Sequence, residues 1–377
     1  MNTRMLFVAV LGLALLALPQ SGQCQELGGP GNAFVSGAGS VGLFSYRPAS
    51  DLVSTVGYGD AGEDMGCDVG CSTGCEDPCG PRWRVYGDLL YLRPANEKVA
   101  FAVPINGPIT QPDMIPVQIG LEAVVDCDYD PGFRVGAGRI LNDCSEIGAA
   151  YTHFETDTYN QIGFDVPYVL RSLVNHPGGL SADTDFLTAE AGLDLDLDLV
   201  DFDYRRVIIC DGCYNLNYLV GARYAHLDQT FASVFTNATT IETVGAAVRF
   251  DGGGIRLGLE GERQIGTFGL MVYGSGVASF VGGEFRGRYA QADSVRGLVC
   301  NTGWNEDRVV SILDIELGMG WSSPGGRLRA TAGYMFSGWF NTVITDEFID
   351  SVRANNSVDA GDSLSFDGLV LRGEVRF

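Results

Sequence analysis

The chain has 377 residues, of which 46% are hydrophobic and 19% charged, and its net charge at pH 7 is −23. A chain this acidic repels phosphates, so the composition argues against nucleic-acid binding. The aromatic content of 10% argues against a disordered chain. Lys98 is the only lysine among 24 basic residues, and glycine is in surplus with 52 copies.

The first residues read as an export signal. Arg4 precedes an apolar run over 5–18, followed by Pro19 and small or polar residues. This order is typical of a secretory signal peptide, which we place at residues 1–25. The run is too short for a comfortable transmembrane helix, and no later uninterrupted apolar run approaches 18 residues. We therefore expect no membrane-spanning helix in the mature chain.

Residues 26–81 are rich in Gly, Ser, Asp and Ala and predict a poorly ordered periplasmic linker. Cys67, Cys71, Cys75 and Cys79 recur every four residues within it. Interleaved glycines and a proline argue against a helix that would align the thiols. Four thiolates could bind zinc, but export to an oxidising compartment favours disulfides among these cysteines.

From residue 82 the hydrophobic pattern has a period of two, which is typical of β-strands. In the last segment, apolar residues at 369, 371, 375 and 377 alternate with a face that carries Arg372, Glu374 and Arg376. Ten segments of this kind are predicted as strands, at about 82–93, 131–140, 146–155, 194–208, 214–230, 254–264, 267–281, 308–321, 326–338 and 366–377.

The connections between these segments alternate in length. Those at 141–145, 209–213, 265–266 and 322–325 are short, those at 94–130, 156–193, 282–307 and 339–365 are long, and 231–253 is intermediate. This asymmetry predicts an antiparallel up-and-down transmembrane β-barrel over 82–377, with short periplasmic turns and long outer loops. We expect about ten strands, with 8–14 possible, because an even number lets the first and last strands pair. A soluble β-sandwich is the alternative. Export, strand length and the arginine–carboxylate composition of the polar face favour the barrel.

One strand carries an irregularity in this pattern. Leucines at 193, 195, 197 and 199 alternate with Asp194, Asp196 and Asp198, and the alternation then changes phase at Val200. A β-bulge at this point would restore the facing of the side chains. We therefore predict a bulge near Val200, with the three aspartates in the lumen.

Four stretches resemble one known family in the same order. They are DYDPGFRVG at 128–136, VGARYAHLD at 220–228, FDGGGIRLGL at 250–259 and FDGLVLRGEVRF at 366–377. With them the chain resembles the Legionella-type pore-forming outer-membrane protein family. The resemblance implies a β-barrel that forms a pore in the bacterial outer membrane. The cysteines at 67–79 are not part of the family's pattern.

If the apolar faces contact lipid, both signs of charge line the lumen. The expected lumen-lining residues are Arg134, Asp196, Asp198, Arg223, Arg256, Glu260, Glu262, Asp314, Glu316, Arg327, Arg329, Arg372, Glu374 and Arg376. In so narrow a barrel these side chains predict either a structural ladder of ion pairs or a narrow charged channel. The family resemblance favours the channel, with small solutes or cations as its partners. The acidic outer loops indicate a weak preference for cations, or else form a solvated acidic surface or hold divalent cations near the outer leaflet. The alternative is a non-conducting surface-structural or adhesion barrel that acts through its outer loops.

The remaining polar groups do not predict an enzyme. His226 and Asp228 could activate water, but a structural pair is the simpler interpretation, and no nucleophile elbow is present. Cys210 and Cys213 flank an Asp-Gly turn and predict a disulfide across it. We expect outer-membrane lipid as a partner, no cofactor and no metal. The sequence does not decide the oligomeric state.

Overall fold

The computed structural model describes residues 82–107, 116–142, 144–178, 186–211, 214–266, 268–356 and 361–377. The expected signal peptide, the linker with its four cysteines, and Cys213 lie outside these residues. Among the described residues, no helix is long and apolar enough to cross a membrane.

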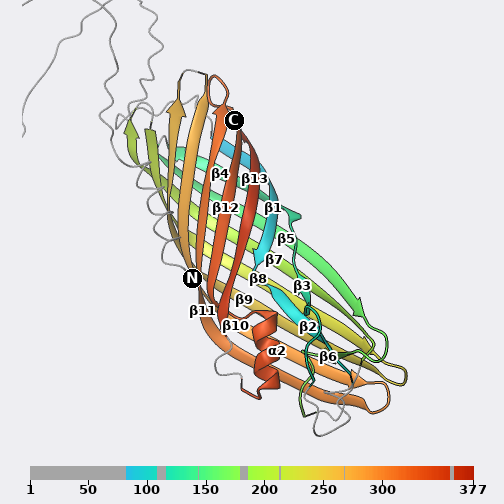
Figure 1. Cartoon of the computed structure of the whole chain (residues 1–377). Coiled ribbons are helices and arrows are strands. Elements are labelled where there is room, and N and C mark those ends of the chain that lie inside the picture. Colours follow the sequence, from blue (N-terminus) through green and yellow to red (C-terminus); the bar gives the residue numbers. More distant parts are fainter. Residues whose placement is uncertain are drawn as a thin grey trace, which may run out of the picture. The chain divides into compact units, whose positions relative to one another are not determined.

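Within the described residues, ten antiparallel strands close into a barrel (Figure 1). They are β1 (Trp83–Ala95), β4 (Asp130–Asn142), β5 (Ser145–Gly163), β7 (Thr188–Asp211), β8 (Tyr214–Thr236), β9 (Ile241–Ile265), β10 (Leu270–Asp293), β11 (Gly297–Ser322), β12 (Leu328–Thr342) and β13 (Asp362–Arg376). Each strand pairs with its neighbour along the chain, and β1 pairs with β13, with Val85 opposite Val375. The predicted ten-stranded antiparallel barrel is confirmed.

The two ends of the barrel differ. Trp83 and Phe377 meet at one end, the turn end, where the four short connections also lie as predicted. At the opposite end the strands run further than predicted. The connections expected at 231–253 and 282–307 shrink to tight turns over 237–240 and 294–296, so the expectation of longer loops there is wrong.

Three connections at this opposite end fold into a structure of their own, which we call the cap. It contains a small sheet in the order β3-β2-β6, formed by β2 (Lys98–Ile105), β3 (Ala123–Asp126) and β6 (Val169–Ser172). It also contains the helix α2 (Thr345–Arg353), which lies at the end of the barrel away from the C-terminus (Figure 1).

The barrel interior changes from polar to apolar along its length. On β7 the buried residues Leu195, Leu197 and Leu199 are followed on the same face by Asp201 and Asp203. The ladder between β7 and β5 runs without a register shift from one end to the other. The predicted bulge at Val200 is therefore absent. Successive side chains of β7 keep alternating between the inner and outer face without interruption. What changes along the strand is the environment of each face.

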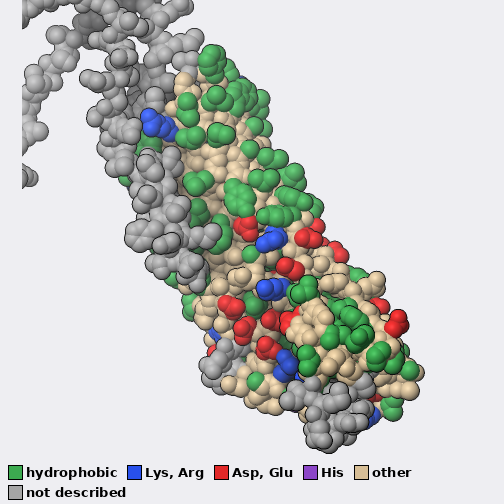
Figure 2. All heavy atoms as spheres, viewed as in Figure 1, with side chains coloured by type: hydrophobic (Ala, Val, Ile, Leu, Met, Phe, Trp, Pro, Cys, Tyr) green, Lys and Arg blue, Asp and Glu red, His purple; other side chains and the backbone are tan. Residues whose placement is uncertain are grey.

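The exterior changes in the opposite sense. In the half nearer the turn end, large apolar side chains such as Phe202, Ile255 and Leu371 are exposed on the outer wall. In the half nearer the cap, charged side chains appear on the wall instead, and Figure 2 shows them gathered there beyond the apolar surface. Lipid outside the half nearer the turn end and water outside the half nearer the cap explain both changes. Apolar side chains avoid water, so they face the lipid in the first half and the barrel interior in the second.

The helix α2 packs its apolar face against the barrel wall. Phe348 and Ile349 are buried, whereas the first turn carries Asp346 and Glu347. A Cβ at Gly287 on β10 would lie 2.4 Å from the Phe348 ring, so this position requires glycine. The cap is thus part of one continuous apolar core with the inner wall.

The apolar half of the barrel should contribute much of its stability. Phe231→Ala removes a ring that is fully buried inside the barrel, and we expect a loss of about 3–5 kcal/mol in the free energy of unfolding. Phe268→Ala is the control, because this ring is 83% exposed in a turn and should cost much less. Denaturant unfolding of both variants in lipid vesicles measures the difference. Equal losses would contradict an apolar interior.

Candidate functional site: the charged lumen and its cap

The lumen of the half nearer the turn end is lined by arginines and carboxylates in nearly equal numbers. They come from nine of the ten barrel strands, all except β10, and each of the nine contributes one to three of them. Among the described residues this set, which we call the charged lumen, contains Arg84, Asp88, Arg134, Glu146, Asp201, Asp203, Arg205, Arg223, Arg256, Glu260, Glu262, Asp314, Glu316, Arg329, Arg372, Glu374 and Arg376.

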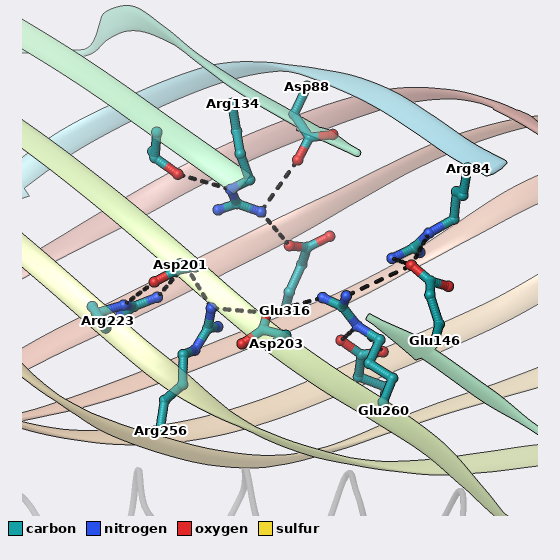
Figure 3. Close-up of polar contacts among 12 residues, drawn as sticks. Arg84, Asp88, Arg134, Glu146, Asp201, Asp203, Arg223, Arg256, Glu260 and Glu316 are labelled. Carbon is teal, nitrogen blue, oxygen red and sulfur yellow. Dashed lines mark hydrogen bonds and ion pairs between the residues drawn. The ribbon is translucent and has the colours of Figure 1, made fainter. Parts of the chain in front are cut away.

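One group of these residues is centred on Asp88 of β1, whose side chain is fully buried. Arg372 binds both oxygens of Asp88 with its Nε and Nη2 atoms, each at 2.8 Å. Arg134 contacts Asp88 at 3.2 Å and reaches Glu316 at 3.5 Å. Since β4 and β11 are not neighbours in the barrel, the contact from Arg134 to Glu316 crosses the lumen (Figure 3).

A second group is centred on Arg223 of β8. Its guanidinium binds Asp201 through Nε at 2.7 Å and Nη2 at 3.0 Å, and its Nη1 reaches Asp314 at 2.6 Å. Arg256 also binds Asp201, at 2.6 Å, and Asp203, at 3.1 Å (Figure 3). Two-point contacts of this kind use the planar fork of arginine, which lysine does not offer. The near-absence of lysine in the sequence therefore has a structural reason.

A third group lies closer to the turn end. Arg205 places its Nε 3.1 Å from Glu260, and Arg84 places its Nη2 2.7 Å from Glu146. Arg329 reaches Glu262 at 2.6 Å across the lumen from β12 to β9. Because each charge has a partner, the lumen carries little net field of either sign.

The structure places most of the expected lumen residues inside the barrel. Eleven of the fourteen face the lumen: Arg134, Arg223, Arg256, Glu260, Glu262, Asp314, Glu316, Arg329, Arg372, Glu374 and Arg376. Arg327 does not, because it lies exposed in the turn before β12, where the barrel has already opened to solvent.

Asp196 and Asp198 are also corrections. They lie on the outer wall, as their neighbour Asp194 does, because the leucines between them are buried in the apolar interior. Asp198 contacts Tyr151, a residue of the outer face of β5. The error followed from the assumption that the apolar face of this stretch contacts lipid, which assigned its acidic face to the lumen.

Several lumen residues escaped the sequence reasoning. Arg84 and Asp88 alternate with the outward-facing Val85 and Leu89 on β1, so the period-two pattern contained the signal. Asp201 and Asp203 were recognisable in the same way, provided that the alternation of inward and outward residues on β7 was continued past Val200 without a bulge. Their ion-pair partners were not recognisable, because contacts across the lumen join strands that are distant in sequence.

The charged lumen surrounds a cavity of about 310 Å³. Arg376 and Glu374 line it towards the turn end, while Phe154, Leu197 and Phe366 line it towards the cap. Beyond these residues the interior is filled by buried side chains such as Phe231 and Phe250. The cavity therefore ends against an apolar section, and the barrel is closed on the cap side in this structure.

The cap is tied to the wall by polar contacts around the start of α2. Gln229 of β8 accepts hydrogen bonds from the Thr345 backbone N–H and hydroxyl, both at 3.1 Å, and donates one to the Val343 carbonyl. Glu97, just before β2, is fully buried nearby. Burial raises the pKa of Glu97 to about 7, against a smaller lowering effect of Thr345. Burial and the neighbouring Asp350 raise the pKa of Asp346 to about 6.

Cys127 is buried in the apolar core, where burial raises the pKa of its thiol to about 12 and keeps it protonated. Cys210 lies at the end of β7, but its expected partner Cys213 is outside the described residues. The disulfide across the turn stays a prediction, as do those among Cys67, Cys71, Cys75 and Cys79.

Comparison with solved structures finds matches of low sequence identity. The outer membrane protease OmpT from Escherichia coli is 13% identical with a TM-score of 0.47, and the match covers 81% of this chain and 99% of that one. A FadL homologue from Pseudomonas aeruginosa is 10% identical with a TM-score of 0.21, over 79% of this chain and 90% of that one. The toluene transporter TbuX from Ralstonia pickettii is 7% identical with a TM-score of 0.22, over 80% and 90%.

No curated protein matches the chain in sequence. A family profile does match, over residues 77–377, and its description is "Legionella pneumophila major outer membrane protein precursor". This match covers the whole barrel, including the apolar outer band and the charged lumen described above. The chain therefore belongs to the Legionella major outer membrane protein family and is a β-barrel of the bacterial outer membrane.

Proposed function

We propose that this barrel is a narrow pore, held closed in this structure by its apolar section and cap, which passes small solutes or ions when the cap undocks. The observation that carries the proposal is the cavity of about 310 Å³ within the charged lumen. Paired charges around a cavity that can hold several water molecules replace part of an ion's hydration, and an apolar constriction in series with them is a known means of gating.

The cap is the movable element in this proposal. It is built from connections between strands, whereas the wall is held by continuous ladders of hydrogen bonds. Cap residues such as Phe101 and Phe348 supply part of the apolar core that closes the barrel. Undocking of the cap would leave a lumen whose outer part is apolar and whose inner part is charged.

A weak preference for cations is part of the proposal. The charges of the lumen compensate each other, so selectivity has to come from the mouth. There, Asp346, Glu347 and Asp350 on α2 outnumber Arg353. An acidic mouth raises the local concentration of cations, by an amount that falls with ionic strength.

A second candidate function is a non-conducting surface barrel that acts through its outer parts. The observation that favours it is the same apolar section, because a packed core of buried phenylalanines and leucines is costly to open. Neither function requires catalysis, and we propose none.

Disrupting the cap core should increase conductance. Phe101→Asp places a carboxylate in a fully buried position of β2, so we expect openings in planar bilayers to be at least tenfold more frequent than in the unmodified chain. Leu121→Asp is the matched control, because Leu121 lies in the same connection and is 89% exposed. Heat-modifiable gel mobility verifies that each barrel is folded.

The outcomes of this experiment separate the two functions. Conductance steps of defined size, with a reversal potential on the cation side, support the pore. A folded Phe101→Asp barrel that stays silent contradicts it and leaves the non-conducting barrel as the better proposal.

Cap docking should weaken as the pH rises. Glu97 has a folded-state pKa of about 7 against an ordinary value of 4.5, so between these values the docked state binds more protons than the undocked state. The stability of docking is therefore fully present below pH about 4.5 and falls as the pH rises to 7, by an amount on the order of 3 kcal/mol. Asp346 acts in the same direction.

Hydrogen exchange of the β2 amides at pH 5 and pH 8, corrected for intrinsic rates, measures this change. Glu97→Gln should remove most of the pH dependence and keep β2 protected at pH 8. Glu122 is an exposed residue of the same connection, so Glu122→Gln should leave the pH dependence of β2 protection as it is in the unmodified chain. Protection of β2 that is equal at both pH values would contradict the assignment to Glu97.

A further inference from the structure

A row of histidines and carboxylates crosses the outer wall where its apolar surface ends. Tyr151 and Tyr224 are exposed aromatic residues on β5 and β8. One pleat further towards the cap, His153, Asp198, His226 and Asp251 lie opposite one another on β5, β7, β8 and β9. These side chains point away from the lumen, so the ion pairs of the lumen do not use them.

Three side chains at one end of this row lie close enough together to bind a metal ion. His153 and Glu155 are two residues apart on the outer face of β5, and Asp196 lies opposite Glu155 on β7. One ring nitrogen of His153 and one carboxylate oxygen each of Glu155 and Asp196 lie within 4.8 Å of one another. A metal with ligands at about 2.1 Å needs ligand atoms no more than about 4.2 Å apart, so small side-chain rotations complete the site.

The histidine of this group is oriented by a further carboxylate. Asp198 lies 2.9 Å from Nδ1 of His153, and the same oxygen accepts a hydrogen bond from the Tyr151 hydroxyl at 2.6 Å. An aspartate at Nδ1 holds the ring proton on that nitrogen and leaves the lone pair of Nε2 free. Histidines that bind metals commonly have such a carboxylate partner, which fixes the tautomer and raises the basicity of the ring.

We propose that His153, Glu155 and Asp196 form a binding site for a divalent transition-metal ion such as Zn²⁺ on the outer wall of the barrel, with Asp198 as the residue that positions His153. One imidazole and two carboxylates favour Zn²⁺ over Mg²⁺ or Ca²⁺, because imidazole is a poor ligand for the harder ions. The ligands are partly exposed, so water completes the coordination. From the sequence we expected no metal, so the proposed site departs from that expectation.

The other histidine of the row provides a matched control. His226 also contacts an aspartate through Nδ1, with Asp251 at 2.7 Å. Within the described part of the chain, however, it belongs to no group of three ligands within bonding reach. The nearby Asp228 is occupied by an ion pair with Arg249. His226 therefore shares the position and burial of His153 but not its metal ligands.

Titration of the refolded full-length chain with Zn²⁺ in detergent, followed by calorimetry, tests the proposal. We expect one binding event that His153→Gln and Glu155→Gln abolish and that Asp198→Asn weakens about 10- to 100-fold. His226→Gln should bind Zn²⁺ as the unmodified chain does. Mg²⁺ at the same concentration should give no event.

The cysteines at 67–79 could also bind Zn²⁺, and Co²⁺ distinguishes the two sites. Thiolate ligands give intense charge-transfer absorption, whereas a site of nitrogen and oxygen ligands gives weak bands only. The proposed site predicts weak bands that disappear in His153→Gln. Binding that is unchanged in His153→Gln and Glu155→Gln, or no binding to the folded barrel, would overturn the proposal.

Discussion

The closed, antiparallel ladder is the constraint on which the rest of this structure depends. Once ten strands pair in register, the direction of every side chain is fixed by its position in the pleat. A side chain cannot change face without a bulge, and β7 has none against β5. The barrel wall therefore adapts to lipid in one half and to water in the other by a change of residue type along each strand. The alternation of inward and outward side chains continues unchanged.

The change of residue type divides the barrel into two parts. Where the wall is apolar outside, the interior holds compensated arginine–carboxylate pairs such as Arg223 with Asp201 and Asp314. Where the wall is polar outside, the interior is an apolar core that the cap completes. The polar part provides space for water, and the apolar part closes it. In the pore that we propose, this apolar part is the gate, and we expect it to respond to the protonation of Glu97, because the charged form of a buried carboxyl group is poorly solvated.

The strand count, the closure, the short turns and the lipid-facing positions could be predicted from the sequence. Each depends on local alternation between apolar and polar residues, which a period of two records directly. The charged residues that face the lumen from lipid-spanning segments, such as Arg256 and Glu316, were predictable for the same reason. Asp196 and Asp198 were not, because the sequence shows that polarity changes face near Val200 but does not show whether the backbone or the solvent changes there.

The sequence by itself determined that this chain is an exported, closed β-barrel with charges of both signs inside. Hydrophobic periodicity indicated the strands, and the signal-like N-terminus, the strand length and the arginine–carboxylate composition of the polar face favoured a membrane barrel over a sandwich. Only the tertiary structure decided that the lumen is blocked, which arginine pairs with which carboxylate, and that His153, Glu155 and Asp196 meet on the outer wall. These features depend on contacts between strands and connections far apart in the chain, and no local pattern encodes such contacts.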